Sequence, residues 1–202
     1  MKPSFFYILK QKLSGKNFVY EFYFKGKKTL DVGCGEGKFL SYDKKLITGI
    51  DTNASCVKRL KSEGYVTELA SAEKIPFGDE SFEAIHCHNV IEHLPVSLAY
   101  AMIRESARVL RSGGIFVLSS EMPTKNFWNT FGHVKPYPPA AIKKLLRAEI
   151  REEFEPISSL EIEGVFYLGN YHKNKFLYLL SAFFGYYTPF CRREYFLVLR
   201  KK

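Results

Sequence analysis

Short apolar runs alternate with helical patterns along most of this chain. Residues 52–62 and 96–110 repeat apolar positions at the spacing of amphipathic helices. Five other runs have the length and composition of buried strands, and they lie at 29–32, 46–50, 66–70, 82–87 and 115–118. Strands that alternate with helices predict a mostly parallel sheet with helices on both faces, which is a doubly wound α/β fold.

The two ends of the chain have a different pattern. Residues 1–25 are basic and aromatic, and we expect a leading helix or arm there. Two further strands are expected over 160–162 and 195–199, which gives a sheet of seven strands. The segment 166–191 between them is an aromatic-rich insertion.

Two boundaries follow from residues that begin or end helices. Gly113 and Gly114 are expected to end the helix over 96–110, just before the strand over 115–118. Pro139 is expected to begin a helix over 139–146, because proline suits the first turn.

Composition is that of an ordinary globular protein. The 202 residues are 46% apolar and 25% charged, which fits one domain over 1–202. The net charge of +9 favours anionic partners such as nucleic acid or an acidic membrane surface. The basic residues are scattered along the chain, so a solvated lysine-rich surface is an equally simple interpretation.

The cysteines and the N-terminal segment suggest a compartment. Cys34, Cys56, Cys87 and Cys191 form no C-x-x-C pair, which argues against a structural zinc site and suits a reducing cytoplasm. The apolar run at 5–9 is too short for a signal-peptide core. We therefore expect a cytoplasmic protein, with peripheral membrane contact left open.

A glycine-rich stretch follows the first expected strand. It reads Asp31-Val32-Gly33-Cys34-Gly35-Glu36-Gly37, and we expect it to open a helix. Glycine permits tight backbone angles and lets a ligand approach the main chain, while a helix start offers exposed N–H groups. A purely structural turn needs one glycine rather than three at alternate positions.

Asp51 ends the second expected strand, 20 residues after Asp31. In doubly wound sheets a carboxylate there can accept hydrogen bonds from both ribose hydroxyls, although it could instead cap the next helix. A dinucleotide fingerprint needs G-x-G-x-x-G, whereas this chain has Gly33-x-Gly35-x-Gly37. Asp31 would repel a pyrophosphate and would suit the ammonium of a methionine moiety. This spacing disfavours a nicotinamide-dependent oxidoreductase.

Four segments resemble, in order, the motifs of class I S-adenosylmethionine-dependent methyltransferases. They are Leu30 to Gly37, Gly49 to Asp51, Ala70 to Glu83 and Arg108 to Gly114. The resemblance covers residues 28–120 and implies a Rossmann-like fold that binds S-adenosylmethionine. It implies a cofactor-binding half over 28–120 and an acceptor-side half over 121–202, after the N-terminal arm of residues 1–25.

The same resemblance assigns cofactor contacts. They are Asp31, Gly33 and Gly35 at the methionine end, Asp51 and Thr52 at the ribose, Ser71, Ala72 and Glu73 at the adenine, and His88 and Asn89 facing the transferred methyl. Where this chain has Ser71, the family often has an aspartate, and a hydroxyl accepts the bond from the adenine amino group more weakly.

The stretch from Asn89 to Leu94 resembles the Glu-Val-Ile-Glu-His stretch of two methyltransferase families. These are quinone-biosynthesis O-methyltransferases and small-RNA terminal 2′-O-methyltransferases, in which the acids and histidines can bind a divalent metal. Glu92, His93 and His133 are candidate ligands here, but Asn89 replaces the leading acid and is a weaker ligand for a hard cation. We expect no metal, and the alternative stays open.

These features predict methyl transfer to a small-molecule acceptor, hydrophobic or lipid-linked. No Asn-Pro-Pro-Tyr-like motif appears, which disfavours methylation of the exocyclic adenine amino group or of a glutamine amide, and no Pro-Cys nucleophile appears, which disfavours C5 methylation of pyrimidines. An RNA methyltransferase and a non-catalytic S-adenosylmethionine-binding partner are the alternatives.

A hydroxyl acceptor needs a base, and we expect His93 or His133 to be that base, unless both histidines are structural. The segment 166–191 is interpreted as an acceptor wall or membrane-docking surface, or alternatively as a core helix or dimer contact. The acceptor itself, the methylated element (O, N or C) and the oligomeric state do not follow from the sequence.

Overall fold

The computed structural model describes residues 2–147, 154–169, 175–189 and 192–202. Seven strands form one sheet in the order β3-β2-β1-β4-β5-β7-β6. β7 is antiparallel to both β5 and β6, and the other pairs are parallel. The strands are β1 Thr29–Val32, β2 Ile47–Asp51, β3 Val66–Leu69, β4 Phe82–His88, β5 Leu110–Glu121, β6 Leu160–Gly169 and β7 Arg192–Lys201. The predicted mostly parallel seven-stranded sheet is thus confirmed.

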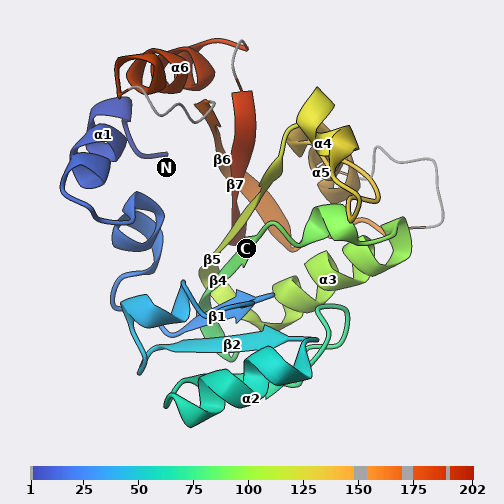
Figure 1. Ribbon diagram of the computed structural model, residues 1–202. Helices are drawn as coiled ribbons and strands as arrows, with labels where there is room; N and C mark the ends of the chain where they lie inside the picture. Colours follow the sequence, from blue (N-terminus) through green and yellow to red (C-terminus); the bar gives the residue numbers. More distant parts are fainter. Residues whose placement is uncertain (1, 148–153, 170–174, 190–191) are drawn as a thin grey trace.

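Helices flank the sheet on both sides (Figure 1). They are α1 Phe5–Leu13, α2 Ala54–Ser62, α3 Val96–Val109, α4 Lys125–Asn129, α5 Pro139–Leu146 and α6 Lys175–Tyr187. The predicted helices over 52–62, 96–110 and 139–146 correspond to α2, α3 and α5, and α1 confirms the leading helix. No helix within the described ranges is long and apolar enough to cross a membrane.

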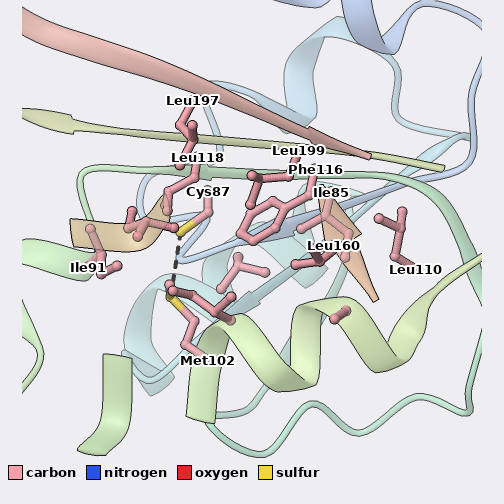
Figure 2. Close-up of a cluster of buried hydrophobic side chains, with 14 of the residues drawn as sticks. Ile85, Cys87, Ile91, Met102, Leu110, Phe116, Leu118, Leu160, Leu197 and Leu199 are labelled. Atoms are coloured by element: carbon pink, nitrogen blue, oxygen red, sulfur yellow. Dashed lines mark hydrogen bonds between the residues drawn. The ribbon is translucent and has the colours of Figure 1, made fainter. Parts of the chain in front are cut away.

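Alternation along the strands divides the core into two clusters, one on each face. Ile85 and Cys87 of β4 point to the face covered by α3 and α5, where Cys87 Sγ lies 3.8 Å from Met102 Sδ (Figure 2). Ala84 of β4 points to the opposite face, where it packs with the N-terminal arm and α2. Asp31 and His86, which sit opposite each other on β1 and β4, belong to the strand positions of this second face.

The glycine turn does not open an α-helix, contrary to the expectation. Between β1 and β2 the regular structure is a single 3₁₀ turn, Leu40–Tyr42. Gly33, Gly35 and Gly37 all have positive φ, so the backbone leaves the right-handed helical region three times. The N-terminal arm packs there instead: the π-helical turn Tyr20–Phe24 brings Phe24 against Phe39, with ring centroids 5.1 Å apart.

The glycines Gly113 and Gly114 do not end α3. The chain enters β5 at Leu110, and both glycines lie inside that strand. Leu110 pairs with Phe82 while Ile115 pairs with Ala84, so β5 bulges between these pairs. The bulge absorbs the extra residues at Gly113, where φ is +75°.

The sixth strand is longer than expected. β6 continues from Leu160 to Gly169, so the first residues of the aromatic segment are strand. Phe166 is buried there and stacks on Phe196 of β7 with ring centroids 4.9 Å apart. The rest of the segment includes α6, and Cys191 lies outside the described residues.

Candidate cofactor and acceptor site

The glycine turn exposes its backbone at the carboxyl end of β1. A Cβ added to Gly33 would lie 2.4 Å from Val90 Cγ2, whereas a Cβ on Gly35 would meet nothing within 4 Å. Gly33 therefore packs closely against the segment after β4, and Gly35 faces open space. A ligand can approach the main chain at Gly35, which is what the spacing of the glycines predicts.

Asp51 holds the turn at the end of β2. Its Oδ2 accepts from the Gly35 N–H and its Oδ1 from the Asn53 N–H, each at 2.8 Å. The cap of α2 is Asn53, whose Oδ1 accepts from the N–H groups of Ser55 and Cys56. Asp51 is thus not the helix cap, and lone pairs on its two oxygens remain for hydroxyl donors.

A cavity of about 360 Å³ lies beside Gly35 and Asp51. It runs along the carboxyl ends of the strands, where doubly wound sheets bind their ligands. Ser71 Oγ hydrogen-bonds to the Glu73 carboxylate on one wall, and the Ala70 N–H donates to Asp51 O. Besides the turn and Asp51, its lining includes Thr52, Ser71, Ala72, Glu73, Asn89, Val90 and His93.

A second cavity of about 510 Å³ lies on the other side of Gly33. Its floor holds Asp31, whose Oδ1 is 2.6 Å from His86 Nδ1. The His86 ring also stacks on Phe39, with ring centroids 3.7 Å apart. Its contacts with Asp31 and Phe39 together fix the position of the His86 ring. His86 is buried, and its contact with Asp31 was not predicted from the sequence. Lys16 and Lys38 also line this cavity and provide positive charge.

A third cavity, of about 270 Å³, opens beside His88. His88 Nδ1 lies 2.7 Å from Ser119 Oγ and 3.2 Å from Glu194 Oε1, so residues from β4, β5 and β7 meet there. Burial raises the pKa of Glu194 to about 8 and lowers the pKa of His88 to about 4. At neutral pH the carboxyl group of Glu194 is therefore mostly protonated, and His88 is neutral.

The three cavities adjoin one another. Gly33 lines the first and second, His88 the second and third, and Asn89 the first and third. Each residue that the sequence assigns to the cofactor lines at least one of them, and these are Asp31, Gly33, Gly35, Asp51, Thr52, Ser71, Ala72, Glu73, His88 and Asn89.

Glu194 is the residue that sequence reasoning missed. It lies at the start of β7, directly before the apolar run 195–199. A glutamate at a strand edge carries no motif, and only the pairing of β7 with β5 brings it beside His88. Its position before an apolar run was the one available signal.

The candidate metal ligands do come together. One potential ligand atom from each of Glu92, His93 and His133 lies within 4.8 Å of the others. His93 Nδ1 is 2.7 Å from Gly132 O and His133 Nδ1 is 3.1 Å from Phe127 O, which leaves the Nε2 atoms as potential ligands. Burial raises the pKa of Glu92. One carboxylate and two imidazoles suit a transition metal better than magnesium.

The two histidines do not line the third cavity. His93 lines the cavity of Asp51, and His133 lines none of the three. The rings pack edge to face with centroids 5.0 Å apart. The structure thus joins His93 with His133 and Glu92, but does not bring this cluster to His88.

Comparison with known proteins agrees with this geometry. Residues 30–118 match the methyltransferase domain family. The fold is that of a SAM-dependent methyltransferase from Archaeoglobus fulgidus, with a TM-score of 0.68, 16% identity, and coverage of 97% of this chain and 100% of the other. Residues 30–118 are therefore similar to a methyltransferase domain, and the chain has the fold of a SAM-dependent methyltransferase.

Curated relatives that match this part of the chain are named for different acceptors. The chain is 31% identical over 105 residues to 27-O-demethylrifamycin SV methyltransferase of Amycolatopsis mediterranei, covering 46% of this chain and 38% of that protein. It is 34% identical over 107 residues to probable tRNA methyltransferase 9B of Bos taurus, covering 50% of this chain and 24% of that protein. The match thus spans well under half the length of these relatives.

Proposed function

We propose that the protein transfers a methyl group from S-adenosylmethionine to a small-molecule acceptor. The observation that carries this proposal is the pair of adjoining cavities on either side of Gly33, with Asp51 in one and Asp31 in the other. An elongated ligand with hydroxyl donors at one end and an ammonium group at the other fits that charge arrangement.

The residues present suit such a cofactor. In the cavity of about 360 Å³, Asp51 would accept from the ribose hydroxyls, and the Ser71 hydroxyl and the Ala72 backbone would meet the adenine. In the cavity of about 510 Å³, Asp31 would hold the ammonium group of the methionine moiety. Lys38 lines the same cavity and would attract the carboxylate of that moiety. His86 orients Asp31 from the neighbouring strand.

The third cavity is our candidate acceptor site. Bound S-adenosylmethionine supplies a methyl group that its sulfonium already activates, so the protein must mainly align the acceptor and exclude water. His88 and Asn89 line both this cavity and a cofactor cavity, which supports methyl transfer at that junction. Leu168 and Gly169 of the aromatic segment line one part of it, and charged side chains such as Lys12 and Arg193 line the rest, which supports an acceptor group that is polar.

The proton of a hydroxyl acceptor needs a base at the same junction. His93 and His133 remain candidates through their Nε2 atoms, because each Nδ1 contacts a backbone carbonyl, but neither histidine lines the third cavity. We favour Glu194, because it lines the third cavity and contacts His88 at 3.2 Å. Its carboxylate would take the proton as the acceptor oxygen forms its bond to the methyl carbon.

An RNA acceptor is the second candidate. The net charge of +9 and the relative named for tRNA methylation support it. The third cavity, at about 270 Å³, supports a compact acceptor group instead. RNA binding whose affinity falls steeply with salt would favour the second candidate over the first. A non-catalytic partner would bind the cofactor and show no turnover with any acceptor.

The experiment that tests the cofactor assignment compares Asp51→Ala with Asn53→Ala by calorimetry. Loss of Asp51 leaves the ribose hydroxyls without their acceptor, so affinity for S-adenosylmethionine should fall by about 1–3 kcal/mol. Asn53→Ala removes the cap of α2 and should lower thermal stability with little effect on affinity. Equal affinity in the wild type and Asp51→Ala would show that Asp51 only organises the turn.

A further inference from the structure

Helix α6 packs on the protein with its small residues and turns its large apolar residues outward. Ser181 and Gly185 are buried against the end of β6, where an added Cβ on Gly169 would lie 2.0 Å from Ser181 O. Four large side chains on the outer side are 37–45% exposed, and they are Leu179, Leu180, Phe183 and Phe184. A surface helix of a globular protein normally has the opposite arrangement, so this helix is not an ordinary core helix.

Helix α1 continues the same surface. Phe5 of α1 packs edge to face on Phe183 of α6 at 5.6 Å, and the Tyr186 hydroxyl donates to Pro3 O. Figure 1 shows the two helices together at one end of the sheet, next to each other. Phe6 and Leu13 of α1 are 75% and 79% exposed, so the apolar surface extends over both helices.

Positive charge lies beside this apolar surface, on and next to α1. Lys2, Lys10, Lys12 and Lys16 are exposed, and Lys2 Nζ lies 5.2 Å from the centre of the Tyr186 ring. Neither residues 1–20 nor residues 164–193 contain an aspartate or a glutamate. Apolar side chains with lysines and no acids are the composition of a helix that lies in a membrane interface.

We propose that α1 and α6 dock the protein on the surface of an anionic lipid bilayer. The apolar side chains enter the boundary between headgroups and acyl chains, and the lysines contact anionic headgroups. The helices lie in the plane of the interface, because α6 has only 13 residues. A second copy of the chain suits this surface less well, because a face-to-face dimer would bring two sets of lysines together.

The docking surface adjoins the site. Lys12 of α1 lines the second and third cavities, and Gly169, on which α6 packs, lines the third. An acceptor anchored in the bilayer would therefore meet the third cavity without leaving the membrane. That consequence rests on the proposed function, whereas docking itself requires neither cofactor nor methyl transfer.

Cosedimentation of the full chain with vesicles tests the docking. Vesicles of phosphatidylglycerol and phosphatidylcholine should bind the wild type, pure phosphatidylcholine vesicles should bind it much less, and added salt should weaken binding. The variant Leu180→Gln/Phe184→Gln changes two outward residues one helical turn apart and should lower vesicle affinity about tenfold or more. Lys2→Gln/Lys10→Gln should weaken binding to the anionic vesicles alone.

A matched control comes from the opposite edge of the sheet. Val66 and Leu69 of β3 are 50% and 57% exposed, so Val66→Gln/Leu69→Gln removes similar apolar area far from α6 in the strand order. This control should bind vesicles like the wild type, and circular dichroism should show that all variants fold. Absence of vesicle binding, or equal loss in both apolar variants, would overturn the proposal. Dimerisation that disappears in Leu180→Gln/Phe184→Gln, without vesicle binding, would assign the surface to a second copy.

Failure of docking and failure of the proposed function are distinguishable. Calorimetry with S-adenosylmethionine on Leu180→Gln/Phe184→Gln should give the wild-type affinity, because neither residue lines a cofactor cavity.

Discussion

At the scale of single residues, burial decides which groups can exchange protons. Glu194 and His88 touch beside the third cavity, and desolvation shifts both groups toward their neutral forms, with pKa values of about 8 and about 4. A glutamate with a pKa near 8 gains its charge within the range where a base is useful.

The first prediction concerns this glutamate as the base. With a hydroxyl acceptor that supports turnover, the wild-type rate should rise as the pH approaches 8, because more Glu194 is ionised. Glu194→Gln should lose this dependence and most of the rate, whereas His93→Ala and His133→Ala should keep the dependence. If one of the histidine variants loses it and Glu194→Gln retains it, that histidine is the base.

The same pKa has a consequence for stability that needs no acceptor. Folded Glu194 keeps its proton up to about pH 8, whereas the unfolded chain loses it near the ordinary value of 4.5. The folded state thus binds more protons in between, and this group's contribution to stability falls as the pH rises from 4.5 to 8. The lowered pKa of His88 has the opposite effect on stability, but only below the ordinary histidine pKa of 6.5. The pH range from 6.5 to 8 therefore reports on Glu194.

Denaturant unfolding of the wild type and Glu194→Gln across that window measures the effect. The wild type should lose stability relative to the variant as the pH rises. Parallel curves would mean that Glu194 has an ordinary pKa and lies in a wetter site than the structure indicates.

Whether turnover needs a divalent metal also depends on a few single residues. We predict that dialysis against a chelator leaves turnover unchanged, because Glu92, His93 and His133 do not line the third cavity and a sulfonium methyl needs no Lewis acid. Turnover measured before and after chelation, with magnesium or manganese added back, provides the check. Activity that disappears and returns with the metal would make the three residues ligands with a role in the reaction.

At the scale of elements, two glycines that both have a positive φ can differ in what they face. Gly35 and Gly64 both have positive φ, +48° and +82°, and an added Cβ on either would meet nothing within 4 Å. Gly35 lines a cofactor cavity, whereas Gly64 follows α2 on the surface.

Alanine at each position should cost stability by about 1–2 kcal/mol. Affinity for S-adenosylmethionine should fall about tenfold or more in Gly35→Ala alone, because its new methyl group would project into the ligand space. Thermal unfolding and calorimetry on both variants distinguish the two effects. A matching loss of affinity in Gly64→Ala would mean that general strain, and not the cavity, is responsible.

The elements that sequence reasoning predicted well have a strong local signal. The strand at 29–32 and the helix at 96–110 are periodic, and they appear within one residue of their predicted ends. The errors occur where tertiary contacts override a local signal. The 3₁₀ turn follows the glycines because the N-terminal arm occupies the sheet face there, and β6 extends to Gly169 because β7 pairs with it along its length.

At the scale of the whole molecule, the two halves of the site differ in how far the sequence predicts them. Asp31, Asp51 and Asn89 follow from motifs at the carboxyl ends of parallel strands, and these ends meet at one edge by the geometry of the fold. The acceptor side depends on β7, which inserts antiparallel between β5 and β6 and carries Glu194 to His88. Such a nonlocal contact leaves no periodicity or spacing in the sequence, so it could not be predicted.

The central claim is that the adjoining cavities around Gly33 bind S-adenosylmethionine, and calorimetry on the wild-type chain tests it most directly. S-adenosylmethionine and its demethylated product should each bind at one site per chain, and each should displace the other. NAD should not compete, because Asp31 would face its pyrophosphate in the turn. Tight binding of NAD with no binding of S-adenosylmethionine would contradict the assignment of the cavities and the function proposed from it.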